Sequence, residues 1–157
     1  MKFDIMEKKG FTLIGYELED AAIQPEICSL AWIKLCSKIR DIENITEPEI
    51  IYGAWYQEKG KEEAYMAGVE VKGVGDVPSE LKTIYIRDAI YATIKIRGRV
   101  DFKNNIGELE TWILNNKNIE FRTPRGVTLE IYDTSQEVND EFKTILGIPI
   151  VNYPRRP

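Results

Sequence analysis

The sequence predicts an α+β fold in which a β-α-β-β module occurs twice, at about residues 11–71 and 83–151. Both segments contain strands and a helix in the same order. Each predicted helix carries one tryptophan, Trp32 in SLAWIKL and Trp112 in ELETWIL. EIIYG aligns with LEIYD, and MAGVEV aligns with ILGIPI with the glycines in register. This repeated order of landmarks indicates an internal duplication, and we expect the helices to cover one face of their sheets.

The first module begins with a strand at FTLIGYEL (11–18). A helix is predicted at 25–40, because a proline occupies its first turn and basic residues occupy its last. Two strands follow at 49–56 and 63–71, on either side of the turn sequence QEKGKE. The first half therefore has the order β-α-β-β.

A connection rich in glycine and proline, KGVGDVPSELK, leads into the second module. Extended segments are predicted within 83–98, then a helix at about 101–115 and strands at 127–133 and 142–151. Residues 83–87, at the start of this region, form an extra extended stretch in front of the repeated β-α-β-β order. At about 100° per residue, the helix gathers apolar residues into one stripe that packs on a sheet. The stripe consists of Phe102, Ile106, Leu109 and Ile113.

Composition and charge limit the possible functions. Of the 157 residues, 43% are hydrophobic and 30% charged, as in an ordinary globular protein, so we expect one compact unit or two small, closely packed halves, in either case a single domain spanning 1–157. The net charge of −5 argues against direct nucleic-acid binding, since such proteins present a basic surface. No apolar run approaches the roughly 18 residues of a membrane span, and the N-terminus lacks a signal peptide's apolar core. We therefore expect a cytoplasmic protein without membrane contact.

The cysteine and histidine content excludes several kinds of chemistry. Cys28 and Cys36 lie in one predicted helix, about 12 Å apart along its axis, which is too far for a disulfide. The chain contains no histidine, so neither a structural zinc site nor a Ser-His or Cys-His nucleophile pair is expected. We expect no metal and no cofactor. Carboxylates, tyrosines, lysines and cysteines remain available for chemistry.

A glutamate interrupts the apolar strand TLEIYD (128–133). Successive side chains of a strand alternate, so Leu129 and Ile131 share one face while Glu130 and Tyr132 share the other. If that second face is solvated, Glu130 is an ordinary surface residue. If it lines a cavity, a carboxylate beside an aromatic ring is a receptor for a cation.

The landmarks together resemble the GyrI-like small-molecule-binding domain, also called the bacterial transcription-activator effector-binding domain. They run in the order YMAGVEV, a VP-containing connection, AIYATIKIRG, a helix with Trp112, TLEIYD and ILGIPI, and they cover nearly the whole chain. The resemblance implies two modules related by a pseudo-twofold axis, with antiparallel sheets. It also implies a groove between the halves that takes bulky, often cationic, aromatic compounds.

The family's best-marked position is a glutamate in the strand after the second helix, followed two residues later by an aromatic residue. Glu130 and Tyr132 match it. The resemblance therefore places Glu130 at the groove floor. We expect it to be withdrawn from water with a raised pKa, and to prefer flat cations, because its own strand offers no basic neighbour.

Other aromatic residues are candidates for the groove walls, although each could instead belong to the core. Tyr52 occupies the position in the first half that matches Tyr132, and we expect both on one wall. Trp55 is a weaker candidate because it points to the face opposite Tyr52, and Trp32 reads as a residue at the rim of the core. The remaining wall candidates are Tyr65, Tyr91 and Trp112.

The sequence departs from the family pattern at two places. Many members have a histidine before the glycine of AIYATIKIRG, where this chain has Ile96 and Arg97 before Gly98. No DNA-binding helical module precedes the domain, so we expect a standalone member. A role in transcription would then need a regulatory protein partner, and a homodimer is also possible.

Three functions remain open. The preferred one is a receptor or sequestering protein for hydrophobic, cationic small molecules. The second is a hydrolase that detoxifies electrophilic compounds, with Glu130 as general base on water and Trp112 or a tyrosine positioning the substrate. The third is an inhibitor of a macromolecular target such as DNA gyrase, for which the charge of −5 is mild.

Overall fold

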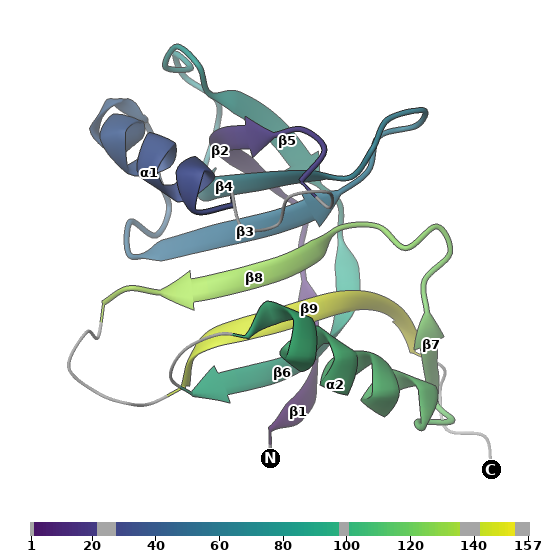
Figure 1. The fold of residues 1–157 in the computed structure, drawn as a ribbon. Coiled ribbons are helices and arrows are strands. Elements are labelled where there is room, and N and C mark those ends of the chain that lie inside the picture. The colour runs from purple at the N-terminus through teal and green to yellow at the C-terminus, as the bar shows by residue number, and fades with distance from the viewer. Residues whose placement is uncertain (1, 22–27, 98–100, 136–141, 153–157) are drawn as a thin grey trace.

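The computed structural model describes residues 2–21, 28–97, 101–135 and 142–152 (Figure 1). Within them, nine strands form one antiparallel sheet and two α-helices pack on it, which confirms the predicted α+β class. The elements in chain order are β1 (Phe3–Lys8), β2 (Phe11–Leu18), α1 (Cys28–Lys38), the 3₁₀ turn η2 (Ile39–Asp41), β3 (Ile50–Tyr56), β4 (Ala64–Val71), β5 (Lys82–Ile86), β6 (Ala89–Arg97), α2 (Phe102–Leu114), β7 (Ile119–Phe121), β8 (Thr128–Asp133) and β9 (Phe142–Asn152).

The predicted strands and helices are present, and two strands were not predicted. β1 and β7 are short and pair with β6 and β9 respectively. The extended region 83–98 divides into β5, which pairs with β2, and β6, which pairs with β1 and β9. Pro25 and Gly98, on which two sequence arguments rest, lie outside the described residues.

The strand order is β1-β6-β9-β8-β3-β4-β2-β5, so the two halves meet at the β3–β8 pair. Outward from this pair, the first half runs β3-β4-β2-β5 and the second runs β8-β9-β6-β1. Each half thus places its strands in the same relative order, as a duplicated module would. Superposition of the modules about a pseudo-twofold axis stays a prediction.

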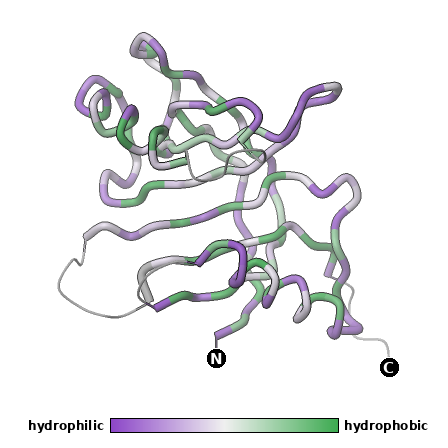
Figure 2. Tube along the Cα trace, viewed as in Figure 1, coloured by the Kyte–Doolittle hydropathy of each residue, from purple (hydrophilic) through white to green (hydrophobic). Residues whose placement is uncertain are grey.

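Both helices cover the same face of the sheet (Figure 1). α1 packs on β2 and β4 around Ala31 and Leu35, whereas α2 packs on β6, β7 and β9 around Leu109 and Ile113. The opposite face carries its own buried cluster, which includes Tyr91. β3 and β8 therefore run between the two helices, where the halves meet. Hydrophilic segments concentrate in the turns (Figure 2).

No helix in the described part of the chain has the length and apolar character that crossing a bilayer requires.

Two glycines, one in the sheet and one in a helix, allow tests of this structure. Gly15 on β2 is paired with Gly68 on β4, and a Cβ at Gly15 would lie 2.1 Å from the carbonyl oxygen of Ala67. Gly15→Ala is expected to lower the free energy of unfolding by about 1–3 kcal/mol, because the backbones must separate. Gly107 lies inside α2 with open space around it. Gly107→Ala should raise the free energy of unfolding by about 0.5–1 kcal/mol through helix propensity.

Urea denaturation of both variants measures these changes. If Gly15→Ala is as stable as the parent chain, the close approach of β2 and β4 is wrong.

Candidate functional site

Glu130 lies at the centre of the sheet, on the face that carries the helices. Its strand, β8, pairs with β3 so that Glu130 is opposite Gly53. Opposite residues of an antiparallel pair point to the same side, so Glu130 shares its face with Trp55 and Tyr132. The Glu130 residue is only 5% exposed. This burial confirms the expected withdrawal of the carboxylate from water.

Three side chains donate hydrogen bonds to the Glu130 carboxylate. The Trp55 indole Nε1 donates to Oε2 at 2.5 Å, and the Tyr132 hydroxyl donates to Oε1 at 2.6 Å. The Tyr65 hydroxyl also donates to Oε1, at 3.2 Å. All three donors are neutral groups. The carboxylate is therefore hydrogen-bonded, but its charge is balanced by no lysine or arginine among the described residues.

This environment raises the pKa of the Glu130 carboxyl. Burial is the dominant cause, because it disfavours the charged form, and the hydrogen bonds from Tyr132, Trp55 and Tyr65 oppose it in part. The pKa values of the Tyr65 and Tyr132 phenols are also raised, first by burial and then by the charge of Glu130. Both phenols thus keep their protons and remain donors.

Aromatic rings surround the carboxylate. Trp32 of α1 donates from Nε1 to the Tyr65 hydroxyl at 2.9 Å, and its ring meets that of Tyr132 edge-on with centroids 4.7 Å apart. The Trp55 ring lies 4.8 Å from that of Tyr65 and stacks at 5.2 Å on Phe102, the first residue of α2. One side chain from each helix therefore contacts the aromatic residues that donate to Glu130.

Gly53 leaves the space that the carboxylate needs. A Cβ at this position would lie 2.4 Å from the Tyr65 hydroxyl oxygen and 2.7 Å from Glu130 Oε1. Any larger residue would displace one of these groups. A glycine inside a strand often marks such a close approach, and here it sets where the carboxylate and the phenol meet.

A cavity of about 350 Å³ opens beside this cluster. Trp55 lines the cavity and its indole N–H also donates to Glu130, so this residue contacts both the open space and the carboxylate. Charged groups at the cavity include the ion pair between Arg125 and Glu110, 2.8 Å long, and Glu63. The complete lining is Trp55, Glu63, Phe102, Lys103, Ile106, Glu110, Arg125, Thr128 and Ile148.

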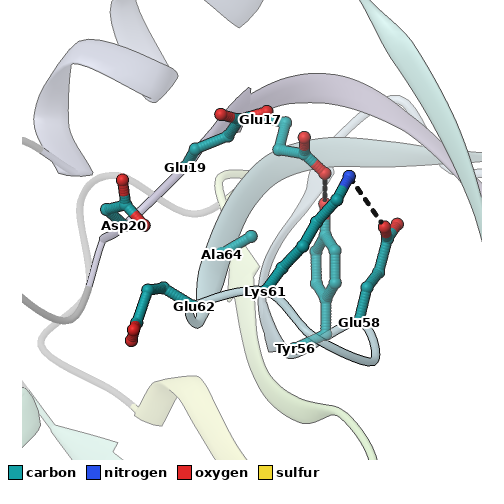
Figure 3. Close-up of a pocket in the computed structure, with 8 residues that line it drawn as sticks. All are labelled: Glu17, Glu19, Asp20, Tyr56, Glu58, Lys61, Glu62 and Ala64. Atoms are coloured by element: carbon teal, nitrogen blue, oxygen red, sulfur yellow. Dashed lines mark hydrogen bonds and ion pairs between the residues drawn. The ribbon is translucent and has the colours of Figure 1, made fainter.

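A second hollow, of about 360 Å³, lies near the ends of β2, β3 and β4 (Figure 3). Its carboxylates belong to Glu17, Glu19, Asp20, Glu58 and Glu62. Tyr56 donates to Glu17, and Lys61 forms an ion pair with Glu58 at 3.3 Å. Glu17 also pairs with Lys82, so part of this acidic charge is balanced internally. The hollow therefore differs from the Glu130 site, where no lysine or arginine in the described part of the chain balances the carboxylate.

Three predicted wall residues do not meet Glu130. Tyr52 pairs with Ile131 and Tyr91 pairs with Pro149, and both tyrosines belong to the buried cluster on the opposite face. The prediction that Tyr52 and Tyr132 share a wall is therefore wrong. Trp112 stacks on Phe3 of β1, with centroids 5.3 Å apart, and no hydrogen bond or ring contact joins it to the described residues around Glu130.

The error has a physical cause in strand register. Aligning EIIYG with LEIYD equates Tyr52 with Tyr132, yet the sheet pairs Tyr132 with Ile51. A slip of one residue moves every side chain of a strand to the other face. Trp55, treated as the weaker candidate, therefore points to Glu130. Of the predicted wall residues, Tyr65 and Tyr132 do lie at the carboxylate.

The sequence reasoning also missed two residues. Trp32, interpreted as part of the core rim, joins the cluster through Tyr65, and Phe102 was treated only as part of an apolar stripe. Neither residue carries a local signal for the site, because its contact depends on how a helix sits on the sheet. Among the described residues, no group of three or more cysteine, aspartate or glutamate side chains is placed to hold a metal ion.

Comparison with known families agrees with this architecture. The family model of integron-associated effector-binding proteins, Cass2, matches residues 4–150. The chain belongs to this family. No curated protein sequence matches it.

Several solved structures share the fold of this Cass2-family chain. SAV2435 bound to tetraphenylphosphonium has a TM-score of 0.75 at 16% identity, over 96% of this chain and 94% of that one. The EcmrR C-terminal domain has a TM-score of 0.68 at 15% identity, over 96% and 98%. A hydrolase from Listeria innocua has a TM-score of 0.57 at 12% identity, over 96% and 92%. The predicted GyrI-like fold is thereby confirmed.

The raised pKa of Glu130 predicts how stability depends on pH. Below the unfolded-state pKa, near 4.5, the carboxyl is protonated in both states. As pH rises, the unfolded state releases its proton while the folded state retains it, so the wild-type chain loses stability until the folded pKa is passed. Each unit of pKa difference corresponds to about 1.4 kcal/mol. Glu130→Gln removes this loss, so the stability of the variant relative to wild type should rise as the pH increases from about 4.5 to the raised pKa of the folded state.

Thermal melts of both proteins across this range measure the trend. The glutamine amide of the variant leaves one of the three donors to residue 130 without an acceptor, which lowers stability at every pH. Only the pH dependence of the stability difference between variant and wild type therefore tests the prediction. Glu62→Gln, which removes an exposed carboxylate, corrects for the general effect of charge. A gap between Glu130→Gln and wild type that is constant with pH would contradict the raised pKa.

Proposed function

We propose that this effector-binding chain binds bulky hydrophobic, cationic aromatic molecules between α1 and α2, with Glu130 at the floor of the site. The observation that carries the proposal is a carboxylate that is 5% exposed, hydrogen-bonded by three neutral side chains, and enclosed by aromatic rings. A buried negative charge without a counter-ion is costly. A ligand that brings a positive charge offsets this cost.

The aromatic rings suit a lipophilic cation that cannot donate a hydrogen bond. Such a cation is attracted to the faces of tryptophan and tyrosine rings, and to the carboxylate by charge alone. Trp32, Trp55, Tyr65 and Tyr132 supply those rings from α1, β3, β4 and β8. These rings contact one another, so they must separate to admit a ligand of this size.

The cavity beside Trp55 is the approach that we propose for the ligand. Its apolar lining includes Phe102, Ile106 and Ile148, and Trp55, which also lines it, stacks on Phe102 and donates to the carboxylate. Rotation of the Trp55 side chain would break its hydrogen bond and open Glu130 to this cavity. The ionised carboxylate binds cations, so affinity for a permanent cation should rise with pH through the pKa of Glu130.

Membership of an effector-binding family supports small-molecule binding, and SAV2435, which shares the fold, is bound to tetraphenylphosphonium. For this chain we propose either sequestration of such compounds or signalling to a regulatory partner. A homodimer and residence in the cytoplasm are part of the same proposal. EcmrR, whose C-terminal domain shares the fold, is also seen in a complex with DNA.

Hydrolysis is the second candidate function, with Glu130 as general base. A carboxyl whose pKa is raised by burial is a better base near neutral pH, and a hydrolase shares the fold. Trp112 lies against Phe3, so a tyrosine such as Tyr65 or Tyr132 would position the substrate instead. Mass spectrometry of the recovered compound separates the candidates, because a binder returns it unchanged.

The central test is Glu130→Gln, which keeps the shape of the side chain and removes its charge. Affinity for tetraphenylphosphonium should fall by about 1–3 kcal/mol, or roughly tenfold to a hundredfold in Kd, because a partly buried charged interaction is lost. Affinity for neutral triphenylphosphine oxide should change little. Calorimetry with both ligands measures the difference.

Two tryptophan variants accompany this test. Trp55→Ala should weaken both ligands, since ring contact does not depend on the charge of the ligand. Trp112→Ala is the matched control and should leave both affinities unchanged, because Trp112 packs on Phe3. Equal losses for the cation and the neutral ligand in Glu130→Gln would mean that the carboxylate is structural.

A further inference from the structure

The face of the sheet opposite Glu130 carries a separate cavity of about 250 Å³. It lies where the β5–β6 and β7–β8 connections meet the end of β9, and it shares no lining residue with the cavity beside Trp55. Two arginines line it, Arg87 and Arg122, and no acidic residue does. In a chain of net charge −5, a cavity with this balance is unusual.

Neither arginine has a counter-ion among the described residues. Arg87 is exposed and Arg122 is half-buried, and neither forms an ion pair or side-chain hydrogen bond with any residue that the structure describes. Glu7 and Asp88 line a neighbouring hollow that also includes Arg122. The Asp88 carboxylate accepts a hydrogen bond from the Gly10 backbone N–H at 2.6 Å. The guanidinium groups therefore remain available to an external anion.

Tyr91 supplies a buried hydroxyl in the same cavity. The residue is 1% exposed, yet its hydroxyl hydrogen-bonds to no described residue. Among the described residues, every fully enclosed side-chain polar atom has a partner. The Tyr91 hydroxyl must therefore reach the open space of the cavity. Burial raises its pKa to about 12, with the charge of Arg122 opposing the rise, so the phenol is a donor at neutral pH and lies near that arginine.

The other walls are apolar, and they include Ile86, Val127 and Pro149. Guanidinium groups bind planar carboxylates through paired hydrogen bonds, and a phenol donates readily to the same oxygens. The volume lies below the usual range of drug-sized sites, which favours a compact ligand. We infer that this cavity is a second binding site, selective for a small apolar carboxylic acid whose carboxylate meets Arg122 and Tyr91. This inference is independent of the proposed function.

Benzoate is the probe, titrated into the full chain by calorimetry and by backbone amide NMR. We expect saturable binding, with shift changes centred on Gly126 and Val127. Arg122→Gln should weaken it roughly tenfold to a hundredfold, the usual effect of removing a charged hydrogen-bond partner. Tyr91→Phe should weaken it several-fold. If Arg122→Gln melts early, Arg87→Gln serves as a second variant that removes a positive charge from the cavity lining, at an exposed position, and it should also weaken benzoate binding.

Arg125→Gln is the matched control, because Arg125 lies in the same connection but lines the cavity on the other face. It should leave benzoate binding unchanged, as should Glu130→Gln. Neutral benzamide should bind far more weakly than benzoate, and inorganic phosphate should not displace bound benzoate. The inference is overturned by absence of saturation, by equal losses in Arg122→Gln and Arg125→Gln, or by benzamide or phosphate binding as well as benzoate.

Discussion

The site depends on one constraint: a carboxylate buried where the two halves of the sheet meet, with three neutral donors and, among the residues that the structure describes, no cation. Trp55, Tyr65 and Tyr132 satisfy the oxygens of Glu130, so the hydrogen-bonding cost of burial is largely removed. The cost of burying the charge remains, and it appears as the raised pKa of Glu130. Gly53 belongs to the same constraint, because any side chain there would displace the carboxylate or the Tyr65 hydroxyl.

The β3–β8 pairing gives the two faces of the sheet different characters. On one face, α1 and α2 deliver Trp32 and Phe102 to the rings around Glu130. On the other face, Tyr91 lines a cavity with arginines. A cation and a carboxylic acid would therefore be bound on opposite sides of the sheet, by groups of opposite charge. Because one register sets both faces, it also decides which aromatic residues each ligand would meet.

Local patterns predict much of this fold, and pairing between distant strands decides the rest. Alternation within one strand is a local property, so it correctly put Glu130 and Tyr132 on one face. Which residues of β3 lie beside Glu130 and Tyr132 depends on how β3 pairs with β8, and the sequence of β3 alone does not specify this register. This is why Tyr52 was expected where Trp55 lies. The short edge strand β1 was missed because its few apolar residues give a weak signal.

The most direct test of the central claim is the pKa of Glu130, measured by ¹³C NMR titration of its carboxyl carbon. In the free protein we expect a value above the usual one for glutamate, and a clear decrease when tetraphenylphosphonium is bound, because a cation favours the charged form. A pKa at or below the usual value that is insensitive to the cation would contradict it.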